Sequence, residues 1–151
     1  RPQEVTRLTW NDIFLDTPSK VIKVRSMASK SGGTRQVSIC AALESWLRIA
    51  PHQEDNSICP PQWPVRWAGL RYRAGWDANG KRWPNVALRH TFASYHVLTH
   101  RDIPRLQLEM GHSSSTQIMH RYMNLSGVDQ EMAERFWNIV PEEDFYADRN
   151  A

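Results

Sequence analysis

The sequence has few cysteines and no long apolar run, and these two absences exclude whole classes of protein. Only Cys40 and Cys59 occur among 151 residues, and they do not form a C-x-x-C pair. A disulfide scaffold or a structural zinc site is therefore not expected, and the chain suits a reducing cytoplasm. No apolar run approaches the ~18 residues that a membrane span needs. We therefore expect no metal and no membrane partner.

An excess of one charge sign is also missing. The chain has 19 Lys and Arg against 16 Asp and Glu, which gives a net charge of +3. This mildly basic balance permits a polyanionic partner but does not require one. The length allows one domain with a real core. Since the chain opens at Arg1 directly in a helical pattern, we expect residues 1–151 to form one domain whose N-terminal part is missing.

Apolar periodicity and turn residues predict helices separated by a small sheet near the N-terminus. The expected helices span 1–8, 41–49, 65–76, 86–100, 102–110 and 129–139, with a further helix from 113 to Tyr122. The expected strands lie within 10–16, at 21–24 and at 36–39. Asp102 and Gly111 are expected to cap the two ends of the 102–110 helix. The sequence thus predicts an α+β fold, mostly helical, with a three-stranded antiparallel sheet packed on a helical bundle.

No phosphate loop, H-E-x-x-H or G-x-S-x-G motif is present. What stands out is a dispersed set of basic residues followed by a tyrosine. The set consists of Arg1, Lys30, Arg89, His112 and Tyr122. Phosphoryl transfer without a metal needs cations that neutralise the transition state and a hydroxyl that attacks. Arginine suits the first task because its planar fork grips two phosphate oxygens.

Four segments carry a resemblance to a known family. Residues 1–13 (RPQEVTRLTWNDI) resemble the first arginine box of the tyrosine recombinases of the phage-integrase type. Residues 87–94 (ALRHTFAS) resemble the second box, residues 109–114 (EMGHSS) the L-G-H box, and residues 120–122 (HRY) the segment with the nucleophile. Lys30, five residues before Arg35-x-Val37, matches the hairpin lysine. The resemblance covers residues 1 to about 140 and implies the catalytic-domain fold of that family.

The resemblance also implies roles for individual residues. Arg1 and Arg89 would clamp the non-bridging oxygens of the scissile DNA phosphate, and His112 would hydrogen-bond the same phosphate. Lys30 would protonate the departing 5′ oxygen, and Tyr122 would attack to leave a 3′-phosphotyrosyl bond. Glu4 would lie behind these groups and orient them. No cofactor, metal or ATP is implied, because the phosphotyrosyl link conserves the energy of the broken bond.

Two positions depart from the family pattern. The family usually has a histidine three residues before the second arginine, and this chain has Val86 there. The histidine-to-tyrosine spacing, commonly nine residues, is ten between His112 and Tyr122. The first departure removes the usual candidate base for the tyrosine proton. Despite the second departure, we still choose Tyr122 as the nucleophile.

Each of these residues also has an ordinary structural interpretation. Tyr122 on an amphipathic helix could be a core tyrosine. Lys30 competes with Lys23 for the lysine role. His96 and His100, four residues apart, could bind a metal but have no third ligand, and His90 is expected to pack internally. The seven tryptophans are expected to anchor the core and the loops. Trp67 and Trp76 are the candidates among them for contact with DNA.

The function expected from this resemblance is site-specific DNA recombination, such as integration or excision of a mobile element. The implied partner is double-stranded DNA, bound by a homotetramer, with no small-molecule substrate. An N-terminal DNA-clamping domain would be absent from this chain, and the place of action would be the prokaryotic cytoplasm, at the nucleoid when on DNA. Two alternatives stay open: a degenerate integrase-like module that binds DNA without cutting it, and a type IB topoisomerase-like enzyme.

Overall fold

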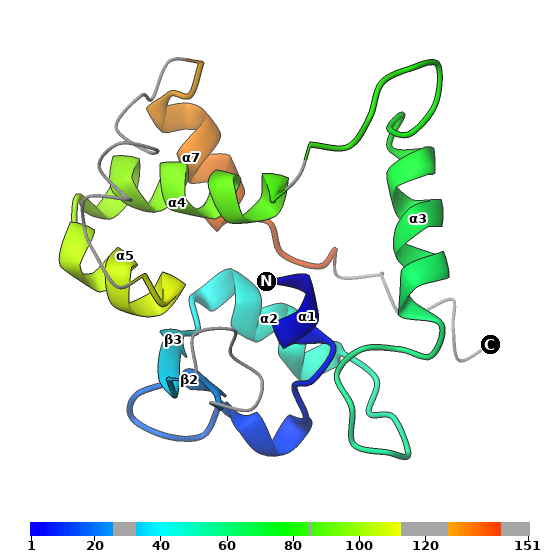
Figure 1. Cartoon of the computed structure of the whole chain (residues 1–151). Coiled ribbons are helices and arrows are strands. Elements are labelled where there is room, and N and C mark those ends of the chain that lie inside the picture. Colours follow the sequence, from blue (N-terminus) through cyan, green and yellow to red (C-terminus); the bar gives the residue numbers. More distant parts are fainter. Residues whose placement is uncertain (26–32, 85, 113–126, 143–151) are drawn as a thin grey trace.

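The computed structural model describes residues 1–25, 33–84, 86–112 and 127–142. In chain order the elements are α1 (Pro2–Val5), η1 (Trp10–Asp12), β1 (Ile13–Phe14), β2 (Val21–Val24), β3 (Arg35–Ser38), α2 (Ala41–Ile49), α3 (Trp63–Arg73), α4 (Ala87–His100), α5 (Ile103–Met110) and α7 (Gln130–Trp137). The predicted α+β class with a small antiparallel sheet is confirmed (Figure 1). No helix within the described ranges is long and apolar enough to cross a membrane.

The sheet has β2 at its centre, paired antiparallel with β1 on one side and β3 on the other. Val24 at the end of β2 is buried and pairs with Arg35, whereas the neighbouring Lys23 is exposed. This alternation follows from the strand geometry, in which successive side chains point to opposite faces. β3 begins one residue before the predicted 36–39 strand, so Arg35 belongs to the sheet rather than to the preceding loop.

Asp12 fixes the segment that links α1 to the sheet. Its buried carboxylate accepts hydrogen bonds from the backbone N–H and the hydroxyl of Thr9, at 3.0 and 3.1 Å. It also pairs with Arg25, at 2.6 Å from Nε. Burial opposes ionisation, but the hydrogen bonds from Arg25 and Thr9 outweigh it and lower the pKa of Asp12. The η1 segment is thereby tied to the residue that follows β2.

The helical core forms where α4 packs against α5 and α7. Ala93 and Leu106 are fully buried, Met110 is nearly so, and Phe92 and Val97 pack against them. Burial of such side chains is the main source of stability in a domain of this size. Because α5 also packs against β3, the helices and the sheet form one structure.

The ends of α5 agree with the prediction. The Asp102 carboxylate accepts a hydrogen bond from the Arg105 N–H at 3.0 Å, and Gly111 follows the helix with a φ of 63°. A left-handed residue at this place satisfies the last carbonyls of the helix, and glycine adopts it without a Cβ clash. The predicted bounds of α2, 41–49, are also confirmed.

The first helix is shorter than predicted, because α1 ends at Val5 rather than Leu8. After Val5 the chain tightens into a turn in which the Arg7 and Leu8 N–H groups donate to carbonyls three residues earlier. Leu8 therefore leaves the helix and enters the core, while Val5 stays 39% exposed. The predicted helix over residues 1–8 is therefore too long at its C-terminal end.

The last helix is also shorter than the predicted 129–139, because α7 spans Gln130–Trp137. Ala133 is fully buried, whereas Met132 and Ile139 are 41% and 56% exposed. The Trp137 ring packs instead against Phe92 and His100, with centroids 5.7 and 5.3 Å apart. α7 ends at Trp137, so Ile139 lies beyond the helix and cannot extend its face.

The helix predicted at 65–76 is present but shifted, as α3 spans Trp63–Arg73. Pro64 is tolerated in its first turn, where an N–H has no intrahelical acceptor. α3 stands apart from α4, α5 and α7 in Figure 1.

Candidate active site

Glu4 is the centre of a buried ion-pair network. Its carboxylate is 4% exposed and accepts hydrogen bonds from two guanidinium groups. Arg1 donates from Nη1 at 2.8 Å, and Arg35 donates from Nη1 and Nη2 at 3.2 and 2.7 Å. The two bonds from Arg35 form the bidentate geometry in which arginine holds a carboxylate most firmly. Glu4 therefore joins α1 to β3.

This environment keeps Glu4 charged at every ordinary pH. Burial by itself would raise the pKa of the carboxyl group. Hydrogen bonds from Arg35 and Arg1 outweigh burial and lower the pKa of Glu4 to about 2. A permanently ionised Glu4 holds Arg1 and Arg35 in fixed positions.

Arg35 extends the network to the end of α5. Its Nε donates to the backbone carbonyl of Glu109 at 2.8 Å. A Cβ added at Gly111 would lie 3.2 Å from Cδ and 3.3 Å from Nε of Arg35, which is closer than most real contacts. Gly111 is thus required twice, once for its left-handed backbone and once because the Arg35 side chain packs on it.

Arg89 lies on α4, and it is bonded to the same segment after α5. Its Nη2 donates to the Met110 carbonyl at 2.6 Å and lies 2.7 Å from Nε2 of His112. Since a guanidinium group carries only donors, Nε2 of His112 must be the acceptor in this contact. His112 is then neutral, with its proton on Nδ1.

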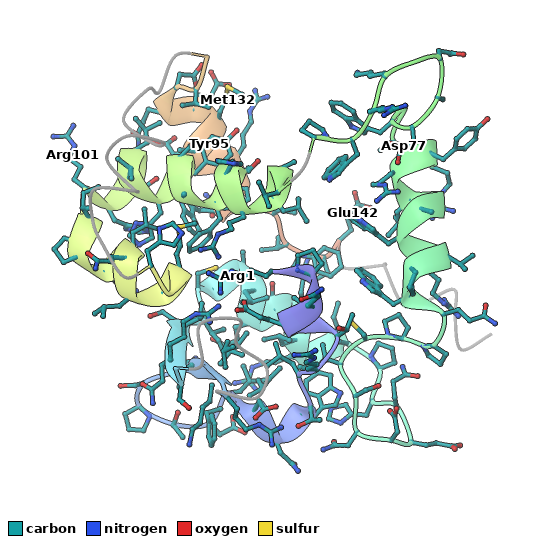
Figure 2. The ribbon with its side chains drawn as sticks, in the orientation of Figure 1. Arg1, Asp77, Tyr95, Arg101, Met132 and Glu142 are labelled. Atoms are coloured by element: carbon teal, nitrogen blue, oxygen red, sulfur yellow. The ribbon has the colours of Figure 1, made fainter. Side chains whose placement is uncertain are left out.

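Arg1 and Arg89 are linked through a short series of bonds although they are far apart in the sequence. Arg1 and Arg35 both pair with Glu4, and Arg35 donates to the Glu109 carbonyl, which is next in the chain to the Met110 carbonyl that accepts from Arg89. Figure 2 shows Arg1 at the centre of the molecule, between the α1–α2 side and the α4–α5 side. Two arginines, Arg1 and Arg35, pair with the carboxylate of Glu4, so this ion-pair group carries more positive than negative charge.

The structure therefore brings together four of the residues predicted from sequence, namely Arg1, Glu4, Arg89 and His112. The other two, Lys30 and Tyr122, lie outside the described residues. Lys23, the alternative to Lys30, is an exposed residue of β2.

Arg35 is the site residue that the sequence interpretation missed. In the sequence it served only as a landmark five residues after Lys30. In the structure it connects Glu4 to the segment that carries His112. The only signal that could have indicated this role is its place at the edge of a strand of otherwise uncharged residues.

Val86 lies at the N-cap of α4, is 49% exposed and has a φ of 56°. A β-branched residue in the left-handed region is strained, because its Cβ crowds the backbone. The valine side chain has no nitrogen or oxygen, so it cannot accept a proton in any orientation.

His96 and His100 form part of an aromatic cluster. Their rings contact each other at 4.7 Å, and Phe92 and Trp137 pack around them. Burial lowers the pKa of His96, and the neighbouring His100 lowers it further. Within the described ranges, no group of three His, Cys, Asp or Glu side chains is placed to hold a metal ion. His96 is therefore a buried residue of this cluster, and the exposed His100 lies at its edge.

Comparison with protein families, curated proteins and solved structures finds no match to this chain.

Glu4→Gln is expected to lower the free energy of unfolding by on the order of 3 kcal/mol at pH 7, because it removes the charge shared by Arg1 and Arg35. The pKa of Glu4 is depressed in the folded state, so its contribution is present above the ordinary value of 4.5. The contribution is lost as the pH falls from 4.5 to about 2. Urea denaturation across this range measures the difference.

Glu131→Gln is the matched control, since Glu131 pairs with Arg135 on the surface, where both side chains are more than 70% exposed. Exposed pairs contribute little, so this variant should unfold like the parent chain. A difference between the Glu4→Gln variant and the parent that stayed constant down to pH 2 would contradict the charge-based explanation.

Proposed function

We propose that this chain is the catalytic unit of a tyrosine-type site-specific DNA recombinase. The observation that supports the proposal is the network of Arg1, Glu4, Arg35, Arg89 and His112, which unites α1, β3, α4 and the end of α5. A cluster of guanidinium groups with one buried carboxylate behind them suits an anion with several oxygens, and a DNA phosphodiester is such an anion.

In the proposed reaction, the hydroxyl oxygen of Tyr122 attacks phosphorus while the bond from phosphorus to the 5′ oxygen breaks. The phenol proton passes to a base, and the 5′ oxygen receives a proton from Lys30. Arg1 and Arg89 neutralise the charge that develops on the non-bridging oxygens. The products are a 3′-phosphotyrosyl link and a free 5′ hydroxyl, and the reverse attack by a hydroxyl rejoins the strand.

Glu4 and Arg35 act through the catalytic arginines rather than on the phosphate. Arg35 is held by Glu4 and by the Glu109 carbonyl, so its fork is committed to the protein. It fixes the distance between Arg1, which is bonded to Glu4, and the segment after α5 that contains His112. Preorganised charges of this kind cost no rearrangement during the reaction.

His112 is the proposed acceptor of the tyrosine proton. A phenol with a pKa of about 10 is rarely ionised at neutral pH, so a base accelerates the attack. Val86 cannot serve. His112 can take up the proton on Nε2 once Arg89 turns its Nη2 from that nitrogen to the phosphate. His120 is a poorer candidate, because residues two apart on an ideal helix point about 200° away from each other.

The proposal is tested with a nicked duplex from which the cleaved strand end diffuses away, so that a covalent intermediate accumulates. We expect a protein–DNA band that survives denaturant and forms equally well in excess chelator, because the proposed positive charges are side chains. An absolute requirement for a divalent ion would point to a two-metal mechanism instead.

A second candidate is a module that binds DNA but does not cut it. Val86 favours this candidate, since the usual histidine is replaced by a side chain without a proton acceptor. Duplex binding without any adduct would support it. Strand exchange between two duplexes would separate the proposed recombinase, acting as a tetramer, from an enzyme that relaxes supercoils like the type IB topoisomerases.

A further inference from the structure

Residues 63–84 form a compact unit around four tryptophans, here called the tryptophan module. Trp63 stacks on Trp67, with ring centroids 5.7 Å apart. Trp83 packs edge-on against both Trp67 and Trp76, each at 5.4 Å. The four rings join α3 to the hairpin that follows it, so the module is held by its own contacts.

A tight turn and the only acidic residue of the module, Asp77, stabilise the hairpin that follows α3. Asn79 and Gly80 have φ values of 52° and 79°, the left-handed pair that a two-residue hairpin turn requires. The Asp77 carboxylate accepts from Arg71 Nε at 2.7 Å and from the Trp83 N–H at 3.0 Å. Asp77 is therefore neutralised inside the module.

The module lies away from the remainder of the chain. α3 has no buried residue, and within the described ranges it makes no extensive contact with another helix or strand. Figure 2 shows Asp77 at the far end of α3, on the opposite side of the molecule from Arg101. A unit placed in this way contributes little to the common core, and its surface is open to a partner.

The positive charge of the chain is concentrated in this unit. Residues 63–84 contain five arginines and lysines and one aspartate, which gives +4 against +3 for the whole chain. Apart from Arg71, which pairs with Asp77, no basic side chain of the module is ion-paired in the part of the chain that the structure describes. Those side chains are Arg66, Arg73, Lys81 and Arg82. Such a surface attracts a polyanion.

One face of α3 is shaped for close approach. Arg66, Gly69 and Arg73 follow at spacings of three and four residues, which place side chains on the same side of a helix. A Cβ at Gly69 would meet only Arg73, at 3.7 Å. The Arg73 guanidinium therefore lies close over Gly69, and no bulky side chain separates the two arginines. An α-helix fits the major groove of duplex DNA, which is about 12 Å wide.

We propose that the tryptophan module binds the phosphate backbone of duplex DNA beside the cleavage site. A single strand would need open aromatic faces on which its bases stack. Here the rings pack on one another, Arg71 lies 5.7 Å from the Trp67 ring centroid, and Lys81 lies 4.4 Å from that of Trp76. The tryptophans thus support the cationic surface and do not read bases. The inference rests on the proposed function for its partner, but its test does not need cleavage.

The test measures how duplex binding depends on salt, by fluorescence anisotropy of a labelled duplex of about 30 base pairs. At about 10 base pairs per helical turn, this duplex has roughly three turns. Arg66→Gln/Arg73→Gln and Lys81→Gln/Arg82→Gln each remove two positive charges from the module. Each phosphate contact contributes about 0.9 to the slope of log affinity against log salt, so each double variant should lower that slope by about 2. Having two independent pairs guards against one variant that fails to fold.

Arg101→Gln/Arg135→Gln is the matched control, because it removes two charges from α4 and α7, far from the module. It should keep the parent slope. Unchanged slopes in both module variants would overturn the inference while leaving adduct formation, and so the proposed function, intact. Tighter binding to a single strand, or binding only to anionic vesicles or an acidic polypeptide, would also overturn it. A loss of slope in a chain that forms no adduct would support the module and refute cleavage.

Discussion

Tyr122→Phe is expected to form no covalent adduct with a nicked duplex while its affinity for DNA stays nearly unchanged. The substitution removes only the phenol oxygen, the proposed nucleophile, and leaves in place the guanidinium groups that contact the phosphate. Denaturing electrophoresis measures the adduct, and anisotropy measures the affinity. Without the hydroxyl no other group at this position can form a phosphoester, so the expected loss is complete.

Tyr95→Phe is the control for this experiment. Tyr95 lies on α4, where its ring packs against Phe136 at 4.9 Å, so loss of its hydroxyl should leave the adduct unaffected. Mass mapping of the peptide that retains a nucleotide identifies the attacking residue directly. An adduct that persists in Tyr122→Phe would contradict the assignment and direct attention to Tyr95 or Tyr146.

Features of the fold that depend on neighbouring residues were predictable from the sequence. Asp102 and Gly111 cap α5 as expected, because capping requires only a side-chain acceptor or a left-handed residue at a helix end. The β2 strand and the bounds of α2 follow from local patterns in the same way. Boundaries failed where a tertiary contact decided them, as at Val5, where the chain turns so that Leu8 can enter the core.

The candidate site shows the same division. The family resemblance implied that Arg1, Arg89 and His112 would lie in one site, and the described residues connect them through Glu4, Arg35 and the end of α5. It could not predict Arg35, whose partners are the Glu4 carboxylate and a backbone carbonyl on α5. A carbonyl leaves no trace in the sequence, since every residue has one.

The tryptophans illustrate a limit of composition. Seven tryptophans suggested core and loop anchors, and Trp137 is partly buried against Phe92, which packs on the core. The tryptophans of residues 63–84 instead pack on one another outside it. Apolar content predicts that a side chain is buried, but only the tertiary structure decides which residues it packs against.

Arg89→Ala is expected to reduce the rate of strand cleavage by about 10³-fold or more, the contribution typical of an arginine that contacts a transferring phosphoryl group. Two effects add to this loss. The charge that neutralises the transition state disappears, and the Met110 carbonyl and His112 Nε2 lose their donor. Single-turnover cleavage of the nicked duplex measures the rate, and circular dichroism confirms that the variant is folded.

Arg101→Ala is the control on the same helix, because Arg101 is an exposed residue directly after α4 and its loss removes an equal charge. Its cleavage rate should equal that of the parent chain. Arg89→Lys is the sharper comparison, since lysine restores the charge without the planar fork that donates to a carbonyl, an imidazole and a phosphate together. We expect it to recover little of the rate. Near-normal cleavage by Arg89→Lys would mean that charge alone suffices, and the ordered contacts from Arg89 to Met110 and His112 would then have no part in catalysis.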